Sequence, residues 1–239
     1  PGDGGELAEV RPFQPGDRLR RIDWRVSLRN REPFVNATLS ERDADVVVMI
    51  DVLNDAANPG QAGILDVTVR AAAALTEHYV HQGDRVSIVE FGPGMRRLRP
   101  GTGRRQFLAA LEWLSDTKVL PNEYIASDRL VSGGYLPFGS VVIMLTPLLD
   151  ERSTEALARL VRSGRTVMTV DTLPAGLRPK LRSQWTYTAY DLWRLGRENT
   201  VGRLRELGVP VSAWHGPGSL DLMLTDLSRI SRAPKLGAR

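Results

Sequence analysis

Two short runs of aliphatic residues constrain the fold of this chain more than any other feature. Residues 46–51 read VVVMID and residues 140–146 read SVVIMLT, and both are apolar at nearly every position rather than at alternate ones. A strand with that composition has both faces buried, which is typical of a parallel sheet covered by helices on either side. Neither run approaches the roughly 20 apolar residues that a membrane-spanning helix needs. The sequence therefore predicts an α/β domain.

Strand and helix signals alternate through the rest of the chain. Further strands are predicted at residues 85–92, 166–171 and 209–214, with a short antiparallel strand at 95–100 after a Gly-Pro-Gly turn. Amphipathic helices are predicted at residues 64–82, 104–115, 153–162, 190–207 and 220–230. This alternation implies right-handed βαβ crossovers. We predict a three-layer, Rossmann-like sandwich over residues 45–239, and an arginine-rich collar over residues 1–44 that packs on it.

Two of these helices have apolar stripes that we expect to face the sheet. On the helix at 64–82 the stripe comprises Leu65, Val69, Ala72, Ala73, Thr76 and Val80. On the helix at 104–115 it comprises Phe107, Leu108, Leu111 and Leu114.

Composition removes several classes of function. The chain has no cysteine, which excludes disulfides, thiolate catalysis and cysteine-ligated zinc. Its net charge is +4, and lysine occurs only at Lys118, Lys180 and Lys235. We attribute this arginine excess mainly to coding bias, so it is no argument for nucleic acid. The chain begins with Pro1 rather than methionine, and we expect an excised piece, which leaves room for a targeting or membrane segment upstream.

A hard-cation site is the chemistry that the strand ends suggest. Ligands of doubly wound sheets bind at the carboxyl ends of the strands. Asp51 ends the first core strand, Asp55 follows four residues later, and Thr102 is expected from a neighbouring loop. Such oxygens, completed by waters, suit a magnesium-type ion. The alternative, which we favour, is that Asp51 accepts hydrogen bonds from loop amides and Asp55 belongs to an Asn-Asp turn.

Other catalytic signatures are missing from the sequence. The segment PGTGRRQ has no phosphate-loop lysine, and no G-x-G-x-x-G or G-x-S-x-G pattern occurs. His78 and His81 are spaced three apart near a helix end, where histidines are usually solvated or favoured by the helix dipole. We therefore do not predict an enzyme.

The arginine-rich segment RPFQPGDRLRRIDW, at residues 11–24, predicts a structural turn. Asp17 follows a Pro-Gly turn and is placed to cap a short helical turn, on which Arg20 and Asp23 can pair. Trp24 supplies an apolar contact. Aspartates inside the basic cluster would repel phosphate, so we predict no nucleic-acid partner.

This segment resembles the signature of the DUF58 family, a von Willebrand factor A-like group. Phe13 stands for the usual tyrosine and Leu28 for alanine. The matching residues are Arg11, Gly16, Asp17, Arg20, Ile22, Asp23, Trp24, Ser27 and Arg29. The likeness continues through GDRVSIVEFG and RENTVGRLRELGVPVSAW, so it covers nearly the whole chain.

The resemblance implies a fold of von Willebrand factor A type, with departures at its metal-ion-dependent adhesion site. In the Asp-x-Ser-x-Ser loop of that fold, Leu53 and Asp55 stand at the two serine positions. Pro147 replaces the aspartate of a later Thr-Asp-Gly loop. We therefore expect a degenerate site, with Asp51, Asp55 and Thr102 lining a residual pocket and no bound magnesium or manganese.

The resemblance also implies a role. DUF58 members are commonly encoded beside MoxR-type AAA+ ATPases and have two membrane-spanning helices ahead of this domain. We expect a non-enzymatic adaptor or co-chaperone of such an ATPase, at the cytoplasmic face of the cell membrane. A metal-dependent hydrolase, acting on a phosphorylated or envelope-derived substrate at the same strand ends, is the alternative.

Overall fold

The structure is a computed structural model, and it describes residues 7–12, 23–30, 32, 34–38, 45–57, 60–119, 136–137, 139–174, 177, 183–216 and 218. The chain divides into two compact units, Pro1–Ala44 and Asp45–Arg239, each with its own sheet. The packing of the collar on the larger unit stays a prediction.

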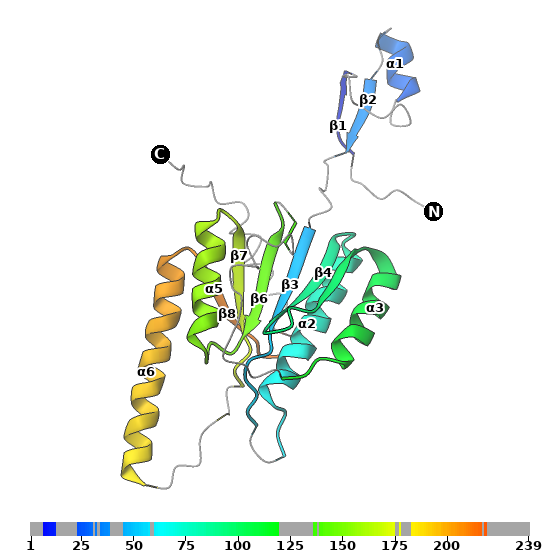
Figure 1. The fold of residues 1–239 in the computed structure, drawn as a ribbon. Coiled ribbons are helices and arrows are strands. Elements are labelled where there is room, and N and C mark those ends of the chain that lie inside the picture. Colours follow the sequence, from blue (N-terminus) through cyan, green and yellow to red (C-terminus); the bar gives the residue numbers. More distant parts are fainter. Residues whose placement is uncertain are drawn as a thin grey trace. The chain divides into compact units, whose positions relative to one another are not determined.

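The larger unit is built on a six-stranded sheet with the order β5-β4-β3-β6-β7-β8 (Figure 1). β5 is antiparallel to β4, and all other neighbours are parallel. The predicted α/β fold with a mostly parallel sheet is confirmed. The strands are β3 (Asp45–Asp51), β4 (Arg85–Phe91), β5 (Arg97–Gly101), β6 (Val141–Thr146), β7 (Thr166–Asp171) and β8 (Val211–Ala213).

The two aliphatic runs form the centre of this sheet. β3 and β6 pair with each other in parallel register, from Val46 opposite Val141 to Ile50 opposite Leu145. Residues 46–50 are at most 2% exposed, because helices cover both faces of the strand.

Helices lie on both faces of the sheet because the strand order reverses at β3 and β6. The connections from β3 to β4 and from β6 to β7 run in opposite directions, so right-handed crossovers place α2 and α5 on opposite faces. α2 packs on β3, β4 and β6, α3 packs on α2, and α6 packs on α5 and β8. These helices are α2 (Ile64–His81), α3 (Gly103–Ser115), α5 (Glu151–Arg162) and α6 (Gln184–Glu206).

Two predicted helix stripes were partly wrong. α2 buries Ile64, Thr68 and Leu75, whereas Leu65 and Val69 are only half-buried. The buried Thr68 hydroxyl lies 2.8 Å from both Ile64 O and Thr172 Oγ1, so a polar residue belongs to the stripe. Hydrogen bonding of this kind removes most of the cost of burying a hydroxyl.

α3 also presents a narrower buried face than predicted. Ala110 and Leu114 are buried, while Leu108 and Leu111 are 54% and 39% exposed. α3 packs on another helix, α2, and one stripe suffices for that contact.

α6 begins at Gln184, six residues earlier than predicted, and β8 is shorter than predicted. Ser183 Oγ accepts a hydrogen bond from Thr186 N at 3.4 Å, and Ser183 N donates to Thr186 Oγ1 at 2.8 Å. In this reciprocal cap threonine stands at the third helical position, where glutamate or glutamine is usual. The sequence pattern therefore did not indicate that the helix begins here. The helix predicted at residues 220–230 lies outside the described residues.

The amino-terminal half of α6 extends past the sheet. Twenty-three residues of helix measure about 34 Å, whereas a strand of six residues measures about 20 Å. The buried residue of α6 is Leu204, near its carboxyl end. In Figure 1 the yellow, amino-terminal end of α6 accordingly stands clear of the strands.

The smaller unit contains β1 (Leu7–Pro12), α1 (Trp24–Asn30) and β2 (Phe34–Thr38), and β1 and β2 form an antiparallel pair. Ser27 joins α1 to β2, because its hydroxyl accepts from Phe34 N at 2.8 Å and lies 2.7 Å from Asp23 O.

One arginine of the larger unit, Arg96, is half-buried and pairs with a buried carboxylate. Arg96 donates through Nε and Nη2 to Glu90 Oε1 at 3.0 and 2.7 Å, and the Glu90 side chain is 3% exposed. Arg96 Nη2 also donates to Trp113 O and Thr117 Oγ1, each at 3.1 Å. Its guanidinium carbon lies 4.0 Å from the centre of the Trp113 ring, a cation–π contact. Arg96 therefore fastens β4 to the carboxyl end of α3.

We expect Arg96→Met to lower the free energy of unfolding by about 3 kcal/mol, because it leaves the buried Glu90 carboxylate without its cation. Urea denaturation measures this change. Arg99→Met, at an exposed position of β5, is the control and should cost less than about 0.5 kcal/mol. Equal effects of the two substitutions would show that the buried pair contributes nothing to stability.

Candidate functional site

Asp51 lies at the carboxyl end of β3, where both oxygens of its side chain accept hydrogen bonds from donors of the protein. Oδ2 accepts from Thr146 Oγ1 at 2.7 Å and from Ser153 Oγ at 2.6 Å, and Oδ1 accepts from Leu53 N at 3.0 Å. The side chains of Asp51, Thr146 and Ser153 are at most 1% exposed. We call these three residues the Asp51 cluster. It ties β3 to β6 and to the first turn of α5.

A tight connection between β6 and α5 places the two hydroxyls of this cluster. Leu148 adopts a φ of +53°, and its N–H donates to Thr146 Oγ1 at 3.0 Å. Asp150 then caps α5 by accepting from Arg152 N at 3.0 Å, which puts Ser153 in the first helical turn. The sequence analysis missed Thr146 and Ser153. The sequence feature that could have identified them is a hydroxyl residue at the end of β6 and another at the start of α5. Both positions lie at the carboxyl ends of the strands, as Asp51 does.

Burial dominates the electrostatics of Asp51. It raises the pKa of this carboxyl, hydrogen bonds from Ser153, Thr146 and Leu53 act in the opposite direction, and the nearby Asp150 raises it further. Asp150 is different, since hydrogen bonds from the Arg152 side chain lower its pKa. The folded state therefore binds the proton of Asp51 more tightly than the unfolded chain does.

These residues do not fit a metal ion of the adhesion-site kind. Such an ion needs several oxygen ligands and retains waters. Here both Asp51 oxygens accept hydrogen bonds inside the core, and the buried Leu53 two residues later has no side-chain oxygen to offer. Across the residues that the structure describes, no group of three or more histidine, cysteine, aspartate or glutamate side chains could hold a metal ion.

Asp55, a predicted pocket residue, is held at the start of α2. Asp55 is exposed, and its Oδ1 accepts from Leu65 N at 3.1 Å, which fixes the start of α2. A Cβ at Gly63 would lie 2.7 Å from Asp55 Oδ1, so glycine allows this close approach.

Thr102 was wrongly assigned to this pocket. It follows Gly101, which pairs with Val86 near the start of β4, whereas Asp51 pairs with Phe91 at the end of β4. Because β5 runs antiparallel to β4, its last residue lies beside the amino-terminal end of β4. Asp51 lies at the opposite, carboxyl end of the strands. Five residues of strand separate the two positions by about 17 Å.

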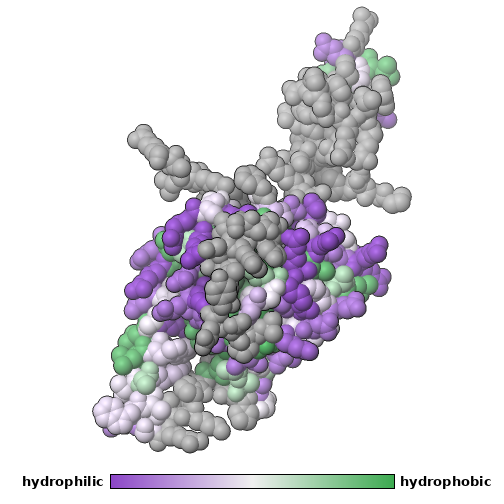
Figure 2. Space-filling model, viewed as in Figure 1, coloured by the Kyte–Doolittle hydropathy of each residue, from purple (hydrophilic) through white to green (hydrophobic). Residues whose placement is uncertain are grey.

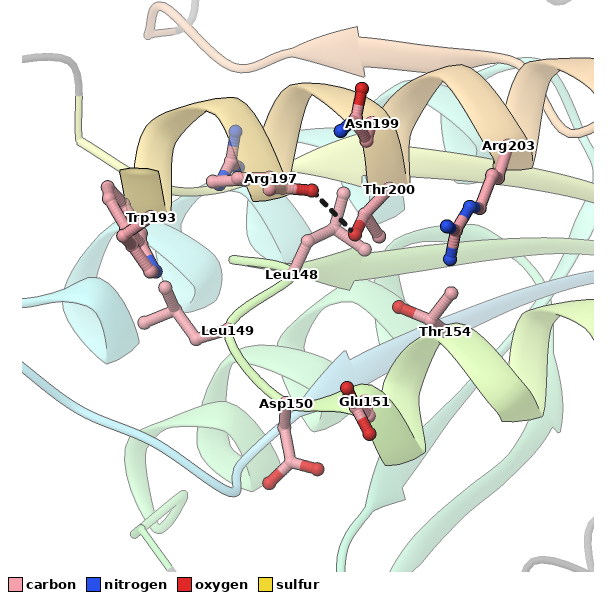
Figure 3. Close-up of a pocket in the computed structure, with 11 residues that line it drawn as sticks. Leu148, Leu149, Asp150, Glu151, Thr154, Trp193, Arg197, Asn199, Thr200 and Arg203 are labelled. Atoms are coloured by element: carbon pink, nitrogen blue, oxygen red, sulfur yellow. Dashed lines mark hydrogen bonds between the residues drawn. The ribbon is translucent and has the colours of Figure 1, made fainter. Parts of the chain in front are cut away.

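A groove of about 400 Å³ opens beside the Asp51 cluster, between α6 and the start of α5 (Figure 3). Leu149 and Trp193 face each other at one end, and Arg203 lies opposite Thr154 at the other. Arg197 connects α6 to the end of β7 and to the loop after β6, because it donates to Asp171 Oδ2 at 2.6 Å and to Pro147 O at 3.1 Å. The lining comprises Leu148, Leu149, Asp150, Glu151, Thr154, Trp193, Gly196, Arg197, Asn199, Thr200 and Arg203.

Comparison with known families shows to which family the chain belongs. Residues 9–174 match the model of a family described as "Protein of unknown function DUF58". The chain belongs to the DUF58 family. The match includes most of the smaller unit and the part of the larger unit that contains the Asp51 cluster, and it ends before α6.

Similar proteins extend this relationship. The chain is 34% identical over 108 residues to Uncharacterized protein Rv1480 of Mycobacterium tuberculosis and, equally, to Uncharacterized protein Mb1516 of Mycobacterium bovis. The aligned region is 44% of this chain and 34% of each relative. A solved structure, the conserved hypothetical protein BatB from Bacteroides thetaiotaomicron, is 12% identical with a TM-score of 0.49. That likeness covers 80% of this chain and 100% of the BatB chain.

The DUF58 signature residues of the smaller unit have structural roles where the structure describes them. Asp23 Oδ1 accepts from Arg25 N and Val26 N at 3.0 and 3.1 Å, so Asp23 caps α1. Arg29 is exposed in the last turn of α1, where its positive charge interacts favourably with the helix dipole.

The remaining collar residues are only partly covered by the structure. Arg11 lies in β1 and Trp24 begins α1, but their side chains are outside the described part of the chain. Gly16, Asp17 and Arg20 lie outside the described residues altogether, so the cap by Asp17 and the Arg20–Asp23 pair stay predictions. Among the described helices of this DUF58 chain, none is both long and apolar enough to cross a membrane.

We expect Asp51→Ala to destabilise the larger unit by about 3 kcal/mol, because Leu53 N and two hydroxyls lose a buried acceptor. Asp55→Ala is the matched control on the exposed carboxylate and should cost about 1 kcal/mol or less. Urea denaturation of both variants measures the difference. Equal costs would mean that the Asp51 cluster does not hold the edge together.

Asp51→Asn keeps the shape of the side chain and removes its titration. The folded pKa of Asp51 is raised, so the folded state binds this proton more tightly than the unfolded state. The protonated carboxyl therefore stabilises the fold, and that contribution is lost as pH rises above about 4 through the folded pKa. Unfolding free energies at several pH values should shift in favour of Asp51→Asn as pH rises. A constant difference would contradict the raised pKa.

Proposed function

We propose that this DUF58 chain is a non-enzymatic protein-interaction module of von Willebrand factor A type, acting as adaptor or co-chaperone of a MoxR-type AAA+ ATPase. The observation that carries the proposal is the Asp51 cluster. The carboxylate at the adhesion-site position accepts hydrogen bonds from Leu53, Thr146 and Ser153, and is sealed from solvent. A partner at the carboxyl ends of the strands is then bound through the shape and the exposed side chains of this surface, and not through a metal ion.

The arrangement of the sheet supports the von Willebrand factor A type. Its order reverses between β3 and β6, its edge strand β5 is antiparallel, and Asp51 ends the first strand at the reversal. Ligand and partner sites of doubly wound sheets form at this point.

The groove beside the cluster has the composition of a protein-docking surface. Leu149 and Trp193 provide apolar area at one end, and the charged Glu151 and Arg203 lie at its border. Protein interfaces combine an apolar, often aromatic centre with a polar rim. Residues of this kind usually dominate the binding energy.

A metal-dependent hydrolase has less support at the same edge, since Asp51, Asp150 and Asp171 have partners within the domain. Asp51 is sealed, Asp150 Oδ2 lies 2.6 Å from Arg152 Nη2, and Asp171 Oδ2 lies 2.6 Å from Arg197 Nη2. The ATPase partner and the cytoplasmic face of the membrane rest on the DUF58 resemblance. Both are proposals for the whole protein, because the aligned region spans only a third of the mycobacterial relatives.

Binding to a purified MoxR-type ATPase from the same genome tests this proposal. We expect Leu149→Asp combined with Trp193→Ala to weaken binding at least tenfold, because both side chains line the groove. Leu108→Asp, on the exposed face of α3, is the control and should bind like the wild type. Surface plasmon resonance with nucleotide-bound and nucleotide-free ATPase gives the affinities. Absence of wild-type binding in both states, or equal loss in the control, would overturn the proposal.

A further inference from the structure

The charges of helix α3 are arranged against its own dipole. Its first turn contains Arg104 and Arg105 and no acid, and its last turn contains Glu112 and no base. Asp116 follows as the residue that caps the carboxyl end. A helix favours negative charge near its amino end and positive charge near its carboxyl end. On α3 both ends carry the opposite sign.

The other helices of the larger unit follow the usual rule. α2, α5 and α6 each have basic residues in the last turn, and α2 and α5 also have an acid in the first turn. α5 is the clearest case, with Glu151 in its first turn and Arg159 and Arg162 in its last. Among these four described helices, α3 alone has neither. Stability of the helix itself therefore does not explain the charges of α3.

The exposed side of α3 is also apolar at its centre. Leu108 and Leu111 are 54% and 39% exposed, and with Arg104 they follow spacings of four and three residues along one side of the helix. The buried residues Ala110 and Leu114 lie about 160° and 120° around the helix from Leu108. We call this exposed side the α3 face. It comprises Arg104, Arg105, Leu108, Leu111, Glu112 and Asp116, all of them exposed.

The α3 face is separate from the groove. α3 packs on α2, whereas the groove lies between α5 and α6, and α2 and α5 cover opposite faces of the sheet. Figure 2 shows green surface among purple on the right of the domain, where Figure 1 places α3. A partner on the α3 face therefore leaves the groove open.

We propose that the α3 face binds the α3 face of a second copy of the chain, with the two helices antiparallel. The basic amino end of each helix then lies beside the acidic carboxyl end of the other. The two helix dipoles also run in opposite directions, so each set of charges compensates the dipole end of its partner. A two-fold axis makes both halves of the contact equivalent, which is the usual symmetry of dimers.

One register satisfies both the leucines and the charges. With Leu108 opposite the partner's Leu111, the symmetric contact pairs Leu111 with the partner's Leu108. Counting along the antiparallel helices then places Arg104 opposite the partner's residue 115. The partner's Asp116 and Glu112 lie one and three residues from that point, about 1.5 and 4.5 Å along the axis. An arginine side chain can reach both carboxylates.

The sign change along α3 favours a second copy over a uniformly anionic surface. A bilayer or a nucleic acid would attract Arg104 and Arg105 but repel Glu112 and Asp116. Lys118 lies beyond the helix, in the loop that follows. A second copy supplies acid opposite base at both ends by symmetry, and it supplies leucines opposite the leucines. Parallel pairing would instead place like charges together, which is unfavourable.

We expect the dimer to be weak. Six residues of one helix are fewer than the roughly 20–30 that each partner contributes to a standard interface. The chain is then monomeric when dilute, so Leu108→Asp stays a valid control for the groove in dilute solution. The proposal does not depend on the ATPase partner, because the α3 face and the groove share no residue.

Two charge-reversed chains test the pairing. The acidic variant carries Arg104→Glu and Arg105→Glu, and the basic variant carries Glu112→Arg and Asp116→Arg. Each change improves the match to the helix dipole, so both variants should unfold at or above the wild-type temperature. Each variant alone has like charges at both ends of the pair, and we expect its self-association to weaken about tenfold or more. Mixing the two variants restores opposite charges at both ends and should restore the dimer.

Sedimentation equilibrium at concentrations up to about 1 mM measures these associations. Leu108→Ser combined with Leu111→Ser should also weaken self-association about tenfold or more, because the apolar centre is lost. Leu192→Ser combined with Leu195→Ser is the matched control, since it removes two exposed leucines from α6 and should leave association unchanged.

Four results would overturn the proposal. They are a wild type that stays monomeric over this range, a dimer that persists in both charge variants alone, a mixture of the variants that associates no better than either one, and an equal loss in the α6 control.

Discussion

The buried Asp51 carboxylate is the constraint on which the functional edge depends. It sits where the strand order reverses, and it accepts hydrogen bonds from β6, from α5 and from the loop after β3. Burying a carboxylate is costly unless its oxygens find donors, and here three donors converge on it. The positions of β6 and of the first turn of α5 follow from that requirement, and the groove lies beside them.

Sealing Asp51 separates this chain from a metal-dependent adhesion domain in physical terms. An adhesion-type ion needs a ligand position that a partner can reach, whereas Asp51 is buried and, within the described part of the chain, its oxygens accept from Leu53, Thr146 and Ser153. The exposed chemistry of the carboxyl edge is instead the groove, and the long helix α6 supplies one wall of it.

The sheet was predictable because continuous aliphatic runs such as residues 46–50 have few stable places except a buried strand. The site was less predictable. Asp51 was found from its place at a strand end, whereas Thr146 and Ser153 are common residue types whose role appears only when two distant segments meet. Thr102 was misplaced because the spacing showed an antiparallel strand but not that its end returns to the opposite edge. The start of α6 was missed because Thr186 completes an unusual cap.

The central claim is that protein donors, and not a metal ion, satisfy Asp51. Thermal unfolding of the wild type in about 1 mM manganese and in chelator measures this directly. An ion bound with micromolar affinity would add about 4 kcal/mol of stability at that concentration. The account predicts the same midpoint in manganese and in chelator. A higher midpoint in manganese that disappears in Asp51→Asn would contradict it.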